Sequence, residues 1–326
     1  MIFERSLNYD DIQIVPQYSE IKSRSDVVLG TNFLGKQISI PVSISNMNVL
    51  SNDRIIKKSH EHKIPIFLSR MKPIIEYKKQ LLQNEFIEYS IPSIGIGTKY
   101  IKMMEEVLSF RKYDIWLLDV SHANNLYVID FFKDIRRIFP HIKFVVGNVA
   151  TADGVQRLQD VGVNSIKIGI SGGYCCTTKN NTGVIRGMIS TILDCIEVTN
   201  VPLIADGNIR GVNDICKAVA IGTELVMSGY LWASTKECAD PKEPLYLGPS
   251  IGETCNKYYG NASTISKKEA GQEIKNIEGE TKFVKVTGSF DDMVIKIKDG
   301  LASCCSYCNV RDIKNLSYNA KFETIS

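Results

Sequence analysis

The sequence carries at residues 164–170 the run Asn164-Ser-Ile-Lys-Ile-Gly-Ile170, a short apolar stretch that is typical of a buried strand. The run leads into a glycine-rich loop, Gly169-Ile-Ser-Gly-Gly-Tyr-Cys-Cys-Thr-Thr178. Glycine lets a backbone turn sharply and approach a ligand closely, because no Cβ obstructs it. A strand that ends in such a loop, with a thiol inside it, predicts that the loop presents a nucleophile to a bound substrate.

Seven further segments repeat this strand pattern, and segments with apolar residues at helical spacing, such as 100–111 and 126–139, lie between them. Alternating strands and helices are typical of βα units and a parallel sheet. Eight units in a chain of 326 residues predict an α/β fold, a single TIM (β/α)8 barrel that spans residues 1–326. The eight predicted strands are 38–44, 64–68, 91–96, 114–119, 142–147, 165–170, 201–205 and 223–228.

Polar residues and glycines stand where the predicted strands end. In TIM barrels the carboxyl ends of all eight strands meet at one rim, and this rim carries the active site. We therefore expect one site there, built from residues that follow all eight strands: Asn46 and Met47, Ser69 and Arg70, Gly95 and Gly97, Asp119, Asn148, Cys176, Asp206 and Gly229.

The composition argues against several other classes of protein. A net charge of +3 without a long block of Lys and Arg gives no electrostatic footprint for nucleic acid. No apolar run reaches about eighteen residues and no charged leader precedes a hydrophobic stretch, so we expect a cytoplasmic protein without a membrane span. The nine cysteines are odd in number and scattered, which predicts reduced thiols. The C-x-x-C spacing in Cys304-Cys-Ser-Tyr-Cys308 lacks a second pair, so helix packing is favoured over zinc binding.

The alternation of strands and helices is lost at about 236–285. This segment is rich in Gly, Lys, Glu and Asn, which predicts a long mobile flap over the active face rather than a linker. Helical periodicity returns at 290–316 and predicts the last helix of the barrel.

Four motifs, in their order and spacing, resemble the IMP dehydrogenase and GMP reductase family: Gly147-Asn-Val-Ala-Thr151, Cys176-Thr-Thr178, Ala205-Asp-Gly-Asn-Ile-Arg210 and Val226-Met-Ser-Gly229. Three N-terminal motifs resemble the GMP reductase branch: Asp11-Ile-Gln-Ile-Val-Pro16, Lys22-Ser-Arg-Ser-Asp-Val27 and Ser45-Asn-Met47. The tail is similar to one bacterial subgroup of these reductases, through Tyr258-Tyr-Gly-Asn-Ala-Ser263, Ile277-Glu-Gly-Glu-Thr281 and Val286-Thr-Gly-Ser289. The connection after the second βα unit is short, so we expect no inserted pair of regulatory CBS modules.

The resemblance implies a covalent mechanism. Cys176 matches the thiol that attacks purine C2, and Thr178 matches the threonine that transfers protons. A cysteine of ordinary acidity is only a few per cent thiolate at neutral pH, so the loop must activate it. The implied reaction is the NADPH-dependent conversion of GMP to IMP and ammonia, carried out by a homotetrameric oxidoreductase of purine nucleotide metabolism.

The resemblance also implies binding residues. Asp206 matches the carboxylate that binds the ribose hydroxyls, Tyr258 matches a phosphate ligand, and Asp119 matches a carboxylate beside the nicotinamide. The implied nucleotide site consists of Asn46, Met47, Asp206, Gly207, Asn208, Gly229, Tyr230, Tyr258 and Gly260, and the implied cofactor site of Asp119, Ser121, Asn148 and Gly169. Family members often bind a monovalent cation through loop carbonyls, which places a K⁺ ion at Gly173 and Cys176.

The chain departs from the family pattern in two places. Position 264 is expected to hold the glutamate that protonates the leaving ammonia, and it is Thr264 here, which leaves Glu269 or Glu273 as other proton donors. At the expected phosphate site, Tyr174, Asn208 and Tyr230 stand in place of smaller residues, which either narrows the pocket or supplies new donors.

These departures leave alternatives open. One is the same chemistry on a deoxy or modified purine nucleotide, such as a 7-deazaguanine nucleotide. IMP dehydrogenase is another, although the Arg-Tyr pair of its flap is missing from residues 236–285. The third is a non-catalytic nucleotide-binding paralogue.

Overall fold

The computed structural model describes residues 5–239, 246–247 and 253–325. A closed barrel of eight parallel strands forms its centre, which confirms the predicted TIM barrel. Each strand pairs with its neighbours in the sequence, and the last strand pairs with the first. The strands are β4 (Val42–Ile44), β5 (Ile66–Leu68), β6 (Ser90–Ile94), β7 (Ile115–Asp119), β8 (Lys143–Val149), β9 (Ser165–Ile168), β10 (Leu203–Asp206) and β11 (Leu225–Ser228).

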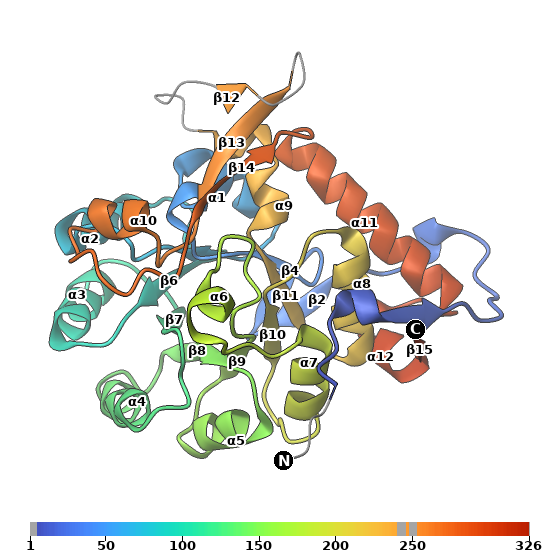
Figure 1. Ribbon diagram of the computed structural model, residues 1–326, viewed down its shortest axis with the longest axis horizontal. Helices are drawn as coiled ribbons and strands as arrows, with labels where there is room; N and C mark the ends of the chain where they lie inside the picture. Colours follow the sequence, from blue (N-terminus) through green and yellow to red (C-terminus); the bar gives the residue numbers. More distant parts are fainter. Residues whose placement is uncertain (1–4, 240–245, 248–252, 326) are drawn as a thin grey trace.

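Helices surround the barrel as a ring (Figure 1). The larger helices follow the barrel strands in turn: α1 (Asp53–Glu61), α2 (Ile74–Gln83), α3 (Thr98–Leu108), α4 (Leu126–Ile138), α5 (Ala152–Asp160), α7 (Met188–Ile196), α8 (Val212–Ile221) and α11 (Phe290–Tyr307). The short helices are α6 (Thr178–Thr182), α9 (Tyr230–Ala233), α10 (Thr264–Glu269), α12 (Leu316–Asn319), η1 (Tyr9–Asp11), η2 (Arg24–Asp26), η3 (Asn48–Leu50), η4 (Lys236–Cys238) and η5 (Ile313–Asn315). No helix in the described part of the chain is both long and apolar enough to cross a membrane.

Alternate residues of the strands serve two different cores. Side chains alternate between the two faces of a strand, so one set faces the barrel interior and the other faces the helices. In β7, Ile115 and Leu117 belong to the inner cluster, whereas Trp116 and Leu118 pack in the outer cluster beneath the helices. The same alternation decides which polar residues at the strand ends point into the barrel.

A hairpin contributes to the inner cluster. Its strands β2 (Thr31–Phe33) and β3 (Lys36–Ile38) are antiparallel, and Phe33 and Ile38 belong to the inner cluster. The predicted strand at 38–44 is therefore two elements, because Ile38 ends the hairpin and the barrel strand begins only at Val42. Pro41 lies between them and has no backbone N–H to continue a ladder.

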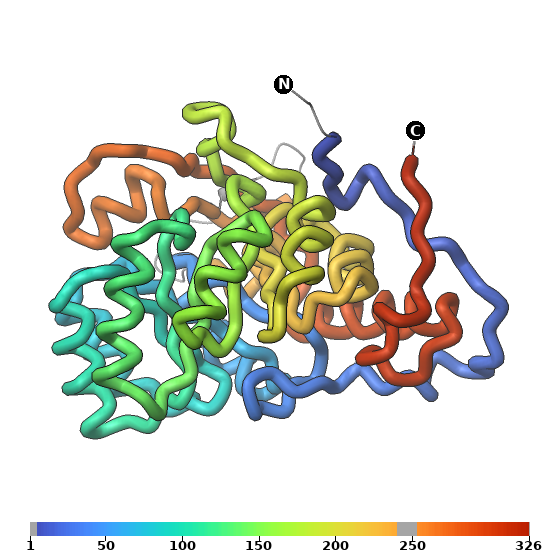
Figure 2. The backbone as a smooth tube through the Cα atoms, turned by 90° about the horizontal axis from the view of Figure 1, so that it is seen from below, coloured from blue at the N-terminus to red at the C-terminus, as the bar shows by residue number. Residues whose placement is uncertain are grey.

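The predicted flap is more regular than the sequence indicates. It contains an antiparallel sheet of β12 (Tyr246–Leu247), β13 (Thr254–Tyr259) and β14 (Thr281–Lys285), with α10 between the last two strands. Residues 240–245 and 248–252 of the predicted flap lie outside the described residues. Figure 2 shows the α10 segment and the loop that carries α6 at the same end of the molecule.

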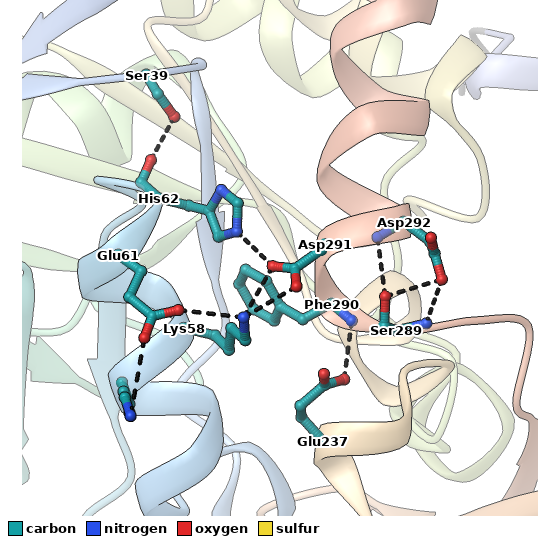
Figure 3. A network of polar contacts seen from close by, with 10 residues as sticks. Ser39, Lys58, Glu61, His62, Glu237, Ser289, Phe290, Asp291 and Asp292 are labelled. Carbon is teal, nitrogen blue, oxygen red and sulfur yellow. Dashed lines mark hydrogen bonds and ion pairs between the residues drawn. The ribbon is translucent and has the colours of Figure 1, made fainter.

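The segments near the two chain ends pair with each other in a separate two-stranded sheet. β1 (Ile12–Val15) pairs antiparallel with β15 (Lys321–Thr324). The helix predicted at 290–316 ends at Tyr307, and η5 and α12 follow it. At the start of α11, Asp291 accepts a hydrogen bond from Lys58 Nζ at 2.9 Å and contacts His62 Nε2 at 2.6 Å (Figure 3). These contacts fix α11 to α1, next to the first strand of the barrel.

Candidate active site

One cavity opens at the carboxyl end of the barrel strands, with a volume of ≈ 580 Å³. It brings together all the residues that the family resemblance implies for catalysis and binding, whereas Ser69, Gly95 and Gly97, which follow the second and third predicted strands, do not line it. The cavity is lined by the predicted Asn46, Met47, Arg70, Asp119, Ser121, Asn148, Gly169, Gly173, Cys176, Thr178, Asp206, Gly207, Asn208, Gly229, Tyr230, Tyr258 and Gly260, and also by Lys167, Tyr174, Arg210 and Glu278.

A second cavity of ≈ 800 Å³ lies beside α1, α2 and α10. Although it is larger, its lining contains neither Cys176 and Thr178 nor any predicted nucleotide-binding residue, and of the residues considered as proton donors it contains only Glu269. Its wall also includes Cys238 and Ala239, which directly precede residues outside the description. We therefore place the chemistry in the cavity at the strand ends, where the reactive side chains converge.

The flap positions a carboxylate beside the glycine-rich loop at residues 169–178, the thiol loop, through backbone pairing. Thr177 N–H donates to the Glu278 carbonyl at 2.9 Å, and Glu280 N–H donates to the Cys175 carbonyl at 2.9 Å. Residue 176 thereby forms an antiparallel bridge with Gly279. These two backbone hydrogen bonds, one on each side of the bridge, fix the segment that carries the Glu278 side chain.

The side chains form a short proton path. The Cys176 thiol donates to Thr178 Oγ1 at 3.2 Å, and the Thr178 hydroxyl donates to Glu278 Oε2 at 2.6 Å. A path from sulfur through hydroxyl to carboxylate can carry the thiol proton away and return it to a leaving group. The arrangement suits nucleophilic catalysis with a built-in acid and base.

None of the three positions considered for the proton donor, Thr264, Glu269 and Glu273, lines this cavity. Thr264 is exposed at the start of α10 and does not line the cavity. Glu269 accepts from Tyr259 OH at 2.8 Å, and Glu273 pairs with Lys275, so neither of the two expected substitutes lines this cavity. The glutamate beside Thr178 is Glu278, because backbone pairing rather than proximity in the sequence brings it there.

The two adjacent cysteines have different environments. Cys175 is 2% exposed, and burial raises the pKa of its thiol to about 11. Cys176 is only partly buried and contacts hydroxyl groups, with Ser171 Oγ at 3.9 Å as the second one. Because the thiolate is the nucleophile, Cys176 is the better placed of the two.

Strand alternation directs a buried lysine into the barrel. Ile166 and Ile168 pack in the outer cluster, so Lys167 between them points inward. Its Nζ lies 2.6 Å from Asp206 Oδ2 and 3.4 Å from Asp119 Oδ1. Burial alone would lower the pKa of Lys167, but the two carboxylates outweigh it and hold the pKa above its ordinary value.

Asp206 is held from two sides. Besides Lys167, the Asn148 side chain donates to its Oδ2 at 3.0 Å, and Asn148 also donates to the Gly169 carbonyl at 2.7 Å. A Cβ at Gly169 would lie 2.2 Å from the Asp206 backbone oxygen, at a φ of +122°, so only glycine fits. Among the described residues Asp206 Oδ1 has no hydrogen-bond donor, which leaves it available to a ligand.

The predicted cation site uses a carbonyl that already has a partner. The Gly173 carbonyl accepts Cys176 N–H at 3.0 Å and closes the turn of the thiol loop. Over the described ranges, no group of three or more His, Cys, Asp or Glu side chains is placed to hold a metal ion. All nine cysteines are free thiols, and Cys305 and Cys308 of the C-x-x-C spacing are buried.

The sequence gives no role to four charged residues of the cavity, Lys167, Lys267, Arg210 and Glu278. A signal for Lys167 was present, because a lone charge inside an apolar strand calls for buried partners. Glu278 stood in a quoted motif without a role, and Arg210 ended another. Their roles depend on contacts that only the folded chain creates.

Comparison with known proteins agrees with this geometry. Residues 6–326 match the sequence model of the IMP dehydrogenase / GMP reductase domain. The chain is 30% identical over 314 residues to a protein named GMP reductase from Lactobacillus acidophilus, with 95% of this chain and 92% of the relative covered. It is 31% identical over 317 residues to a GMP reductase from Staphylococcus aureus, with 95% and 93% covered. The barrel, the thiol at its rim and the match along the chain together place this protein in the IMP dehydrogenase and GMP reductase family.

Proposed function

We propose that the protein is an NADPH-dependent oxidoreductase that removes the 2-amino group of a guanine nucleotide. In the proposed reaction GMP, NADPH and a proton give IMP, NADP⁺ and ammonia. The observation that carries this proposal is the path from Cys176 through Thr178 to Glu278, at 3.2 and 2.6 Å. The two relatives reported above are both named GMP reductase, which supports the same class of chemistry.

The first half of the reaction needs only residues of this chain. The Cys176 proton passes through the Thr178 hydroxyl to the Glu278 carboxylate, and the resulting thiolate forms a bond to purine C2. Glu278 then returns the proton through Thr178 to the amino nitrogen. The C2–N bond breaks, ammonia leaves, and the purine remains bonded to sulfur as a thioimidate.

The second half restores the thiol. NADPH supplies the hydride that C2 accepts. As the C2–H bond forms, the C2–S bond breaks and its electron pair returns to Cys176. A proton from solvent, taken up through the same residues, completes the turnover.

The residues at the Asp119 side of the cavity suit a nicotinamide cofactor. Asp119 Oδ1 and Oδ2 are held by Lys167 at 3.4 Å and by Arg70 Nε at 3.7 Å. Ser121 and Asn148 add polar side chains to the same wall. In this proposal these residues would hold the nicotinamide, which would supply a hydride to C2, and Asp206 Oδ1 would accept a hydrogen bond from a hydroxyl of the substrate ribose.

A second candidate is the same chemistry on a modified or deoxy purine nucleotide. Tyr174 and Tyr230 favour it, because their rings meet with centroids 4.9 Å apart at one end of the cavity and reshape the space for the substrate. This candidate uses the same Cys176 path and differs only in the ligand.

The test measures NADPH oxidation together with ammonia release. The wild type and Cys176→Ala are each supplied with GMP, dGMP or a 7-deazaguanine nucleotide. In a separate assay they are supplied with IMP and NADP⁺. Coupled signals on GMP that vanish in Cys176→Ala support the proposal. A signal on the deazaguanine nucleotide alone supports the second candidate. Silence on every substrate, despite nucleotide binding, overturns both.

A further inference from the structure

Three tyrosines meet at one end of the active-site cavity. Tyr174 comes from the thiol loop, Tyr230 begins α9 after the last barrel strand, and Tyr258 lies in β13 of the flap. The Tyr174 ring lies 4.9 Å from the Tyr230 ring and 6.3 Å from the Tyr258 ring, measured between centroids. All three line the cavity that contains Cys176.

A guanidinium group stands against these rings. The central carbon of Arg210 lies 4.5 Å from the Tyr174 centroid and 5.7 Å from the Tyr230 centroid. At this range each ring attracts the cation and limits its orientation. Arg210 follows β10, so it approaches the cavity from the loops at the ends of the last two barrel strands.

Among the described residues Arg210 has no counterion, unlike Arg70 and Lys167. Lys267, which also lines the cavity, donates instead to the backbone carbonyls of Lys275 and Asn276. Arg70 pairs with Asp119, and Lys167 pairs with Asp119 and Asp206. Within the described parts of the chain no carboxylate pairs with the Arg210 guanidinium and no side chain or carbonyl accepts a hydrogen bond from it. A cation on a cavity wall without a counterion is suited to an anionic ligand.

At this end of the cavity, some backbone N–H groups already donate hydrogen bonds within the protein. TIM barrels often bind phosphate through the loops after the seventh and eighth strands. Here the Asn208 N–H, in the loop after the seventh strand, donates to the Gly172 carbonyl at 2.8 Å. A Cβ at Gly207 would lie 3.1 Å from Gly172 Cα, so the two loops are packed against each other. A side-chain donor can therefore replace an amide that is already used.

We propose that Arg210 is a specificity-determining residue that binds the phosphate of the substrate nucleotide, with Tyr174 and Tyr230 holding its guanidinium in place. The inference rests on the proposed function for the identity of the ligand, a purine nucleoside monophosphate. Guanidinium presents paired N–H donors that match two phosphate oxygens, which an ammonium group does not. This chain thus recognises the anion through a side chain where barrels commonly use backbone amides.

Lys282 provides the matched control. Its Nζ lies 4.6 Å from the same Tyr174 ring, but it is paired with Glu280 at 2.8 Å. It also does not line the cavity. Removal of this charge leaves the Arg210 cation in place.

The experiment compares the binding of GMP and guanosine by calorimetry, because the two ligands differ only in the phosphate. We expect the wild type to bind GMP more tightly than guanosine. Arg210→Met should weaken GMP binding at least about tenfold and leave guanosine binding unchanged, Arg210→Lys should lie between the two, and Lys282→Met should match the wild type. Thermal melts of the variants separate loss of the contact from loss of the fold.

Two results overturn the inference. One is a wild type without a preference for GMP over guanosine, and the other is an Arg210→Met variant that keeps this preference. NADPH oxidation tests the proposed function separately. A protein that binds GMP through Arg210 but does not oxidise NADPH supports this inference and contradicts the function. Turnover of GMP with an unchanged KM in Arg210→Met supports the proposed function and contradicts this inference.

Discussion

The Thr178 hydroxyl donates a 2.6 Å hydrogen bond to Glu278, although 100 positions separate the two residues in the sequence. One residue belongs to the loop after the sixth barrel strand and the other to the flap after the eighth. The contact therefore joins two distant segments. Knowing the fold of each segment alone would not show that these two side chains meet. In the proposed mechanism, this contact makes the flap part of the catalytic apparatus.

Replacement of this carboxylate should remove the acid and base. We expect Glu278→Gln to lower kcat by about two to four orders of magnitude while GMP binding persists, because an amide cannot exchange the proton. Ammonia release in a single turnover measures the step directly. Glu280→Gln is the control, since Glu280 lies two positions away and pairs with Lys282. Equal losses in both variants would show that the flap segment, rather than the carboxylate, matters.

The two neighbouring thiols should differ in reactivity. Cys176 is partly exposed, whereas burial raises the pKa of Cys175 to about 11. Iodoacetamide should therefore modify Cys176 first, since alkylation requires an accessible thiolate. Peptide mass spectrometry assigns the modified residue. Cys176→Ala should be inactive and Cys175→Ala active, and an active Cys176→Ala variant would refute the assigned nucleophile.

Loss of the buried lysine should destabilise the barrel. Lys167→Met removes the cation shared by Asp119 and Asp206 and leaves Arg70 as the partner of Asp119 alone, which is expected to cost about 3–5 kcal/mol of the free energy of unfolding. Urea unfolding measures this loss. The exposed Lys133, paired with Asp130 on α4, serves as control and should change stability by less than about 0.5 kcal/mol when replaced by Met. Addition of Asp119→Asn should recover part of the loss, and a fully additive double variant would speak against the coupling.

Acid should weaken the contact between α1 and α11. Hydrogen bonds from Lys58 and His62 hold the pKa of Asp291 below its ordinary value. A carboxyl whose pKa is lower in the folded state contributes stability above its unfolded pKa, and this contribution is lost as the pH falls through the folded pKa. The effect is small because the Asp291 side chain is 47% exposed.

The measurement for this prediction is the melting temperature as a function of pH. Asp291→Asn should be less stable than the wild type at neutral pH, and the difference should shrink below the ordinary pKa of aspartate. Asp130→Asn on the exposed face of α4 provides the comparison. A difference that stays constant across the acid range would exclude the linkage.

The sequence predicted the barrel because its signals are local. β-branched apolar runs and helical spacing depend on neighbours within a few positions, and eight repeats of the pattern allow few other folds. The ends of strands were less certain, as at 38–44, where Pro41 separates a hairpin strand from a barrel strand. For 236–285 the sequence predicts a long mobile flap and no sheet, because its strands are short and charged and their pairing partners lie far apart in the chain.

The candidate site also combines features that are local in the sequence with features that depend on the fold. The sequence by itself determined that Cys176, Asp119 and Asp206 stand at strand ends, and barrel topology then requires them to share one rim. Only the tertiary structure decided which carboxylate serves the thiol, because Glu278 reaches Thr178 through hydrogen bonds between two loops. It also decided that Arg210 stacks on Tyr174 without a counterion. Contacts of this kind depend on the register between distant segments, which the local pattern of residues does not encode.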